Sequence, residues 1–126
     1  MPLTNVGRDF IAGIFIGEAL TPFNNANAYI GVGDSNAVFA KAQADLQAAV
    51  NKLRKAMEAG YPTRSGNILS FRSLFSTAEA NFAWEEWGVF NAAAAGDMAN
   101  RKVESLGTKT AAQSWQLTVD LTVDNP

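Results

Sequence analysis

The alternating segment at residues 115–123 constrains the fold more than any other part of the chain. Apolar and polar side chains alternate there at every position, which is the period of a strand that buries one face and exposes the other. Such a face needs a second layer to cover it, so the segment predicts a β-layer architecture. The inward face would consist of Trp115, Leu117, Val119, Leu121 and Val123.

Other segments extend this β-rich prediction toward the middle of the chain. Residues 67–76 place Leu69, Phe71 and Phe75 on one face of a strand, and residues 100–107 indicate a further short strand. Tyr29, Ile30 and Val32 favour a strand that ends in the turn 33–36. The sequence therefore predicts a mainly β, α+β fold of the β-sandwich kind.

The aromatic segment 81–90 supplies most of the candidate site residues. Strict alternation would place Trp84, Glu86 and Phe90 on one face, with Trp87 on the other. The neighbouring Glu85 and Glu86 would then point apart, so they do not form an acid–base pair. A carboxylate on an apolar face needs a partner, and we expect Arg54, Arg64 or Arg72 to supply it.

The same aromatic residues have two competing interpretations. Trp84, Trp87 and Trp115 would suit a sugar-stacking platform, but strand tryptophans more often lie in a core or a subunit interface. We adopt the second interpretation. Trp84, Glu86, Trp87, Phe90, Trp115 and Leu117 are accordingly structural or interface candidates, together with Arg54.

The N-terminal region favours a helix. Val6, Phe10 and Ile14 recur at a spacing of four residues, and Thr4 or Asn5 is suited to cap the first turn. The helix should end near Gly17. Its apolar stretch is too short to span a bilayer, and a signal peptide's basic start is absent. Phe10 and Ile14 are therefore interface candidates, and no membrane contact is expected.

A second short helix is expected over residues 40–50. Leu46, Val50, Leu53 and Met57 follow helical spacing, and alanine is abundant around them. Residues 52–57 mix charged and apolar side chains, so a strand at that point stays open.

Composition argues against an enzyme. The chain has no cysteine and no histidine, which removes thiolate nucleophiles, cysteine-based zinc sites and the commonest general base. The turn around Asp34 lacks the carboxylate density of a calcium site, so no metal or cofactor is expected. The net charge is −2, which does not favour nucleic-acid binding.

The surface should instead bind other proteins. Charged residues make up only 17% of the chain, below the quarter that is usual. A low charge fraction suits a surface that partners cover. We expect these contacts to use the N-terminal helix or the aromatic strand faces.

The C-terminal third of the chain resembles the tail-collar fibre family of tailed-bacteriophage structural proteins. The matching features are Glu86-Trp87-Gly88-Val89-Phe90, the turn Gly96-Asp97, Lys109 and the closing strand 115–123. Residues 5–13 and 28–46 also resemble small phage virion proteins. This resemblance implies a β-rich domain, commonly trimeric, that lies on the virion and carries no catalytic residues.

Together these expectations describe one structural domain over residues 1–126. Unlike a tail fibre, this sequence shows no long distal part, so a capsid decoration (cement) protein is the preferred interpretation. It would be made in the host cytoplasm, form a homotrimer, and bind the major capsid protein or other virion proteins on the particle surface. A tail, collar or fibre component is the first alternative, and a carbohydrate- or receptor-binding module is the second.

Overall fold

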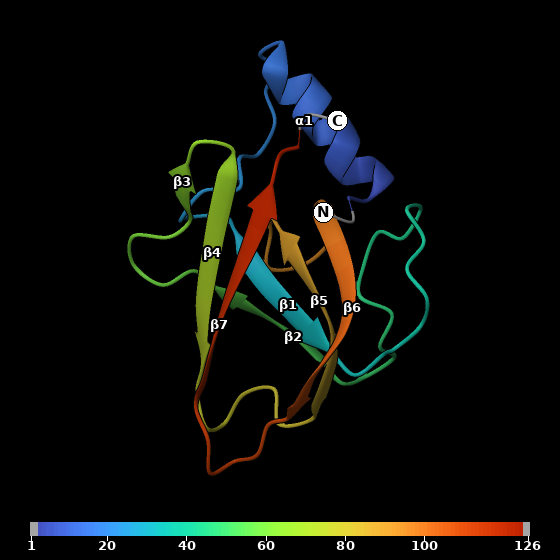
Figure 1. The fold of residues 1–126 in the computed structure, drawn as a ribbon, viewed down its shortest axis with the longest axis vertical. Helices are drawn as coiled ribbons and strands as arrows, with labels where there is room; N and C mark the ends of the chain where they lie inside the picture. Colours follow the sequence, from blue (N-terminus) through green and yellow to red (C-terminus); the bar gives the residue numbers. More distant parts are fainter. Residues whose placement is uncertain (1–2, 125–126) are drawn as a thin grey trace.

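A computed structural model describes residues 3–124 as two antiparallel sheets with one helix at the end of the molecule (Figure 1). The four-stranded sheet has the order β2-β1-β5-β6 and the three-stranded sheet the order β3-β4-β7. The predicted mainly β, sandwich-like fold is therefore confirmed. The elements are α1 (Asn5–Phe15), β1 (Tyr29–Gly33), β2 (Lys52–Ala56), β3 (Thr63–Ser65), β4 (Ile68–Phe75), β5 (Ala83–Phe90), β6 (Met98–Thr108) and β7 (Trp115–Thr122).

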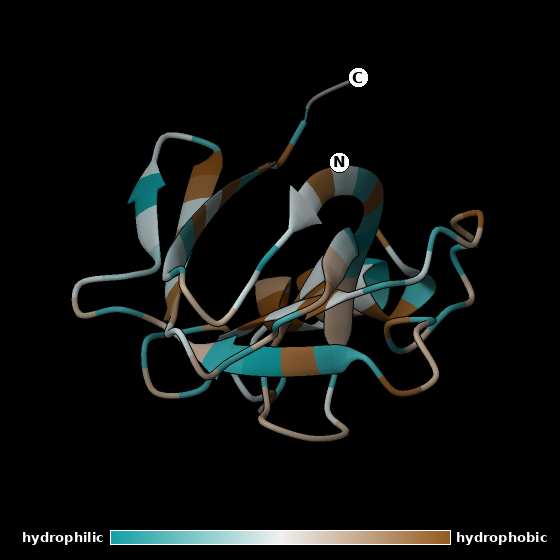
Figure 2. Ribbon diagram, turned by 90° about the horizontal axis from the view of Figure 1, so that it is seen from below, coloured by the Kyte–Doolittle hydropathy of each residue, from teal (hydrophilic) through white to brown (hydrophobic). Residues whose placement is uncertain are grey.

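The main core lies between the two sheets, which appear as separate layers when viewed along the long axis (Figure 2). It contains side chains from β1, β4, β5 and β7, as the alternating patterns predicted. Val119 and Leu121 of β7 are buried, whereas Trp115 and Leu117 are half-buried and Val123 lies beyond the end of the strand. The fully or nearly buried members include Ile30, Val32, Phe71, Phe75, Trp84, Trp87 and Val89.

The expected division of the β5 side chains between two faces holds for Glu86, Trp87 and Phe90 but is wrong for Trp84. The pairing of β5 with β6 is irregular between Trp84 and Glu86, because an advance from Gly107 to Val103 on β6 matches an advance of only two residues on β5, and such irregularities disrupt the ladder and bend the strand. Trp84 consequently joins Trp87 in the main core, while Phe90 packs with Leu46 and Met98 in a second cluster. The sequence pattern contained no sign of this irregularity.

The expected second helix over residues 40–50 is also wrong. This stretch forms turns and irregular backbone. The amides of Gln47 and Ala48 donate to the carboxylate of Glu86 instead of to carbonyls four residues earlier. Val50 is exposed, and Leu53 packs on the main core from strand β2. A tertiary hydrogen-bond acceptor has overridden the local helical preference.

The predicted N-terminal helix is confirmed as α1. Thr4 caps it, because its hydroxyl oxygen accepts a hydrogen bond from the Gly7 amide at 2.9 Å. A side chain at position 7 would collide with the Ala99 carbonyl, so Gly7 allows α1 to approach β6 closely. The helix therefore lies across one end of the sandwich (Figure 1).

Candidate assembly surface and its buried support

A buried ion pair holds the long loop between β1 and β2. Arg101 Nε lies 2.8 Å from Glu86 Oε1, and both side chains are completely buried. The expected partners Arg54, Arg64 and Arg72 are therefore wrong, because Arg101 fills that role. The two residues are diagonal neighbours across the β5–β6 pair, where Arg101 is opposite Gly88.

The remaining hydrogen bonds of this pair go to loop 34–51. Glu86 accepts from the amides of Gln47 at 2.7 Å, Ala48 at 2.8 Å and Ser35 at 3.3 Å. Arg101 donates to the Ala37 carbonyl at 3.0 Å and to Gln43 Oε1 at 3.2 Å. The charged groups are thus satisfied inside the protein, and they fix a loop that has no secondary structure of its own.

Two glycines of β1 make room for this arrangement. A side chain on Gly33 would collide with the Glu86 carboxylate, and one on Gly31 would come within 2.6 Å of the Phe90 ring. Glycines two positions apart on a strand indicate close approach from one face. That spacing was the available sequence signal for this site, although it does not identify Arg101.

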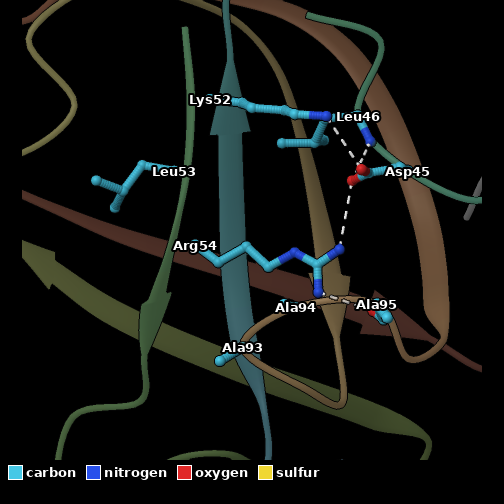
Figure 3. Close-up of a pocket in the computed structure, with 8 residues that line it drawn as sticks. All are labelled: Asp45, Leu46, Lys52, Leu53, Arg54, Ala93, Ala94 and Ala95. Atoms are coloured by element: carbon cyan, nitrogen blue, oxygen red, sulfur yellow. Dashed lines mark hydrogen bonds and ion pairs between the residues drawn. The ribbon is translucent and has the colours of Figure 1, made fainter. Parts of the chain in front are cut away.

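Arg54, another predicted site residue, lies on the rim of a cavity of about 270 Å³ (Figure 3). Its guanidinium stacks 3.6 Å from the centre of the Phe90 ring and donates to the carbonyls of Ala92 and Ala95, both at 2.9 Å. A carboxylate oxygen of Asp45 is 3.4 Å away. These contacts connect β2 to loop 91–97, and they use the N–H donors of the guanidinium within the protein.

Asp45 also binds Lys52 at 3.0 Å, so a carboxylate lies between the two cations of this cavity (Figure 3). Burial tends to raise the pKa of Asp45. Hydrogen bonds from Lys52 and the Leu46 amide, and the charges of Lys52 and Arg54, outweigh burial and lower the pKa below its usual value. Asp45 thus offsets one of the two positive charges that line the cavity.

The tryptophans do not form an exposed platform. Trp84 is 1% exposed, contacts Phe75 and Trp115 edge-to-face, and donates its indole N–H to the Ala80 carbonyl at 2.9 Å. Trp87 is also buried in the main core. Half-buried Trp115 lines an open cavity of about 310 Å³ together with Leu117 and the edge of the buried Trp84. The sequence-based interpretation of strand tryptophans as core residues fits this arrangement.

Lys109 is a buried residue whose position the sequence patterns did not reveal. Its side chain is 1% exposed, and Nζ donates to Asn81 Oδ1 at 2.7 Å. Asn81 is oriented in turn, because its amide nitrogen donates to the Thr77 carbonyl at 2.9 Å. The contact joins the loop before β5 to the segment before β7, on the side of the sandwich far from α1 (Figure 1).

Helix α1 carries the largest uncovered apolar side chains of the described residues. Phe15 is 88% exposed and Ile16 is 76% exposed, while Ile11 and Ile14 are more than one third exposed. Phe10 is half-buried and packs edge-to-face on Phe23, with ring centres 4.9 Å apart. The predicted interface residues Phe10 and Ile14 therefore lie together on α1, whereas Trp84, Trp87 and Phe90 are interior.

An apolar groove of about 200 Å³ runs between α1 and the three-stranded sheet. Every residue that lines it is apolar, so it offers no side-chain hydrogen-bond donor or acceptor. We call it the α1 groove. Its lining consists of Leu3, Gly7, Phe10, Ile11, Ile14, Phe23, Leu69, Phe71, Ala99, Leu121 and Val123.

The described range, residues 3–124, contains no group of three or more Asp or Glu side chains placed to hold a metal ion. None of its helices is long and apolar enough to cross a membrane. No protein-family model, curated protein or solved structure matches the chain.

Proposed function

We propose that this protein is a non-enzymatic structural component of a tailed-bacteriophage virion, and specifically a capsid decoration protein. The observation that carries the proposal is the uncovered apolar surface of α1 beside the α1 groove. An apolar patch of this kind, rimmed by polar surface, is typical of a protein–protein interface. Synthesis in the host cytoplasm and assembly on the particle surface as a homotrimer belong to the same proposal.

The interior of the molecule supports an assembly role in a second way. The Glu86–Arg101 pair and the Arg54 stack hold two irregular loops, 34–51 and 91–97, in fixed positions. A rigid binding surface loses less conformational freedom when a partner docks. This arrangement suits a cement protein, whose contacts must match a regular lattice of capsid subunits.

The resemblance of the C-terminal third to phage collar proteins supplies the virion context. The residues that match the phage collar proteins occupy positions on which the fold depends. Glu86, Phe90 and Lys109 are fully buried, and Gly88 lies where a side chain would meet the Asn100 carbonyl at 2.6 Å. The resemblance thus concerns the framework of the domain, and the proposal places no chemistry on these residues.

Localisation on purified particles tests this proposal. The protein would be labelled, its copies per virion counted, and its position mapped by cryo-electron microscopy. Many copies distributed over the head would support the decoration role. A few copies confined to the tail would transfer the assignment to a collar or fibre component, and absence from particles would refute the virion role.

A carbohydrate-binding module is the second candidate, because Trp115 lines an open cavity with Leu106 and Leu117. Half-buried Trp115 is the one tryptophan available for stacking on a sugar ring. Glycan-array binding that is lost in Trp115→Ala would favour this candidate. Absence of binding in the unmodified protein would remove it.

A further inference from the structure

The end of α1 forms an ordered apolar projection. Phe15 and Ile16 are almost fully exposed, yet the backbone around them is closed by hydrogen bonds. The amides of Ile16 and Gly17 donate to the carbonyls of Gly13 and Ile14, at 3.2 Å and 3.1 Å. Gly17 has a φ of +84°, which is typical of the residue that ends a helix. The backbone that carries both side chains is therefore ordered before any partner arrives.

The α1 groove has the properties of a receptor for such a projection. Its volume of about 200 Å³ lies below the roughly 300–1,000 Å³ of sites for drug-sized ligands. It is suited to a few aliphatic or aromatic side chains. Its rim is accessible, because Ile11, Ile14 and Val123 are each about 40% exposed. An apolar lining without polar groups excludes specific recognition of a sugar or a nucleotide.

The projection of one molecule does not reach the groove of the same molecule. Ile14 lines the groove, and side chains one position apart on a helix point about 100° apart. Phe15 therefore points away from the groove while α1 keeps its position across the end of the sandwich (Figure 1). Filling the groove with these residues requires a second copy of the chain.

Charge also favours a second copy over an acidic or basic partner. Arg8 and Asp9 are the charged residues of α1, and they bind each other at 2.8 Å. The helix thus has no net side-chain charge that would repel an identical helix. It also has none that would select a partner of opposite charge.

We propose that Phe15 and Ile16 of one copy insert into the α1 groove of a second copy. Two copies can make this contact reciprocally about a two-fold axis, and head-to-tail repetition leads instead to a closed ring, such as a trimer, or to an open filament. This inference rests on the proposed function in one respect, because the assembly role is what requires copies to meet. It deepens that function by naming the surfaces that meet.

Cysteine cross-linking tests the contact cleanly, because the natural chain has no cysteine. A Glu18→Cys copy and an Asp124→Cys copy would be mixed and treated with a short bismaleimide, both as concentrated protein and on particles that carry both variants. Glu18 and Asp124 are exposed and lie next to the contact in the sequence, so these variants keep Phe15, Ile16 and Val123. The expected product is a cross-linked dimer that contains one copy of each variant. The matched control pairs Val38→Cys with Asp124→Cys, because Val38 is 86% exposed but lies on loop 34–51. Equal yields from the two pairs would overturn the contact.

Self-association provides an independent measurement. Phe15→Ser and Val123→Glu should each weaken it roughly tenfold to hundredfold, as expected when burial of one large apolar group is lost. Val38→Ser should leave the dissociation constant unchanged. Unaltered association in both test variants, with unaltered melting, would also overturn the contact.

The outcomes separate this inference from the proposed function. Many copies on the head without the cross-link between positions 18 and 124 would reject the contact and leave the decoration role standing. A strong cross-link in a protein that is absent from particles would reject the virion role and keep the contact.

Discussion

At the scale of single residues, the carboxylate of Glu86 connects the β5–β6 pair to the long loop between β1 and β2. It binds a buried guanidinium and accepts three backbone amides from one loop. Such a pair adds little net stability relative to apolar residues of similar shape, because both ions must lose their hydration. Its specific contribution here is the position of loop 34–51.

Removal of one charge from this pair should be costly. We expect Glu86→Gln to lower the free energy of unfolding by about 3–5 kcal/mol, because Arg101 would remain buried without its counter-charge. Urea denaturation measures the change. The neighbouring Glu85→Gln is the matched control, since Glu85 is only half-buried and makes a hydrogen bond of 3.3 Å to Ser105. Equal and small losses in both variants would contradict this account.

Lys109 and Asn81 allow a test in which the two partners respond in opposite ways. Asn81→Ala should cost about 1–3 kcal/mol, because the buried ammonium loses the hydrogen bond at 2.7 Å. Lys109→Met keeps the length of the side chain and removes the charge, so its cost should be near zero or negative. Thermal melting of both variants distinguishes this pattern from one in which Lys109→Met is the more damaging change.

At the scale of secondary-structure elements, β7 was the most predictable part of the chain. Its inward-facing residues are nevertheless buried to different degrees. Leu121 is 5% exposed, whereas Leu117 is half-buried. Leu121→Ala should therefore cost about 2–5 kcal/mol, and Leu117→Ala roughly 1–2 kcal/mol. Equilibrium unfolding of the two variants checks the order. A larger loss for Leu117→Ala would mean that β7 packs differently.

The Lys55–Glu79 ion pair joins β2 to the loop after β4 and should make stability depend on pH. The hydrogen bond from Lys55 Nζ, at 2.8 Å, and one from the Ser76 amide lower the Glu79 pKa from 4.5 to about 2. A depressed pKa means that the stabilisation is present above pH 4.5 and is lost as the pH falls toward about 2.

Because this pair is partly exposed, its contribution should stay below about 1 kcal/mol. In Glu79→Gln, the unfolding free energy should fall less steeply below pH 4.5 than in the unmodified protein. Urea titrations at several pH values, with Glu85→Gln as the control for loss of one carboxylate, measure the difference. Parallel pH profiles for Glu79→Gln and the unmodified protein would show that the pair has no such role.

The elements that were predicted correctly share one property, which is that short-range pattern determines them. The alternation of residues 115–123 and the four-residue spacing from Val6 to Ile14 record which face is apolar. The errors arose where a distant group supplied the hydrogen bonds. Residues 40–50 have helical spacing, but the Glu86 carboxylate takes the amides of Gln47 and Ala48.

The candidate site was predictable only in part for the same reason. Glu86 was recognised as a carboxylate that needs a cation, but the choice of Arg101 depends on the β5–β6 register and its bulge. Phe10 and Ile14 were identified from the helical stripe. The exposure of Phe15 and Ile16 depends on where α1 docks, which Gly7 and Ala99 decide through close backbone contact.

At the scale of the whole molecule, the apolar residues of the core are distinct from those exposed at the end of α1. The core lies between the two sheets, whereas α1 lies at the end of the molecule (Figure 1), and Phe15 and the capping residue Ile16 are exposed at the end of that helix. Residues that are exposed in the single chain add little to its stability. Changes at the end of α1 should therefore separate stability from assembly, which changes in the core cannot do.

The double substitution Phe15→Ser and Ile16→Ser should change the unfolding free energy of the dilute protein by less than about 0.5 kcal/mol. The same variant should fail to associate or to occupy particles, because both projecting side chains are lost. Urea denaturation, analytical ultracentrifugation and a count of copies on particles measure the two effects separately. The matched variant Val38→Ser also removes an exposed apolar group, on loop 34–51, and should retain both the stability and the self-association of the unmodified protein. A large loss of stability in the α1 variant would mean that Phe15 and Ile16 serve the fold of the single chain, and full occupancy of particles would mean that assembly uses another surface.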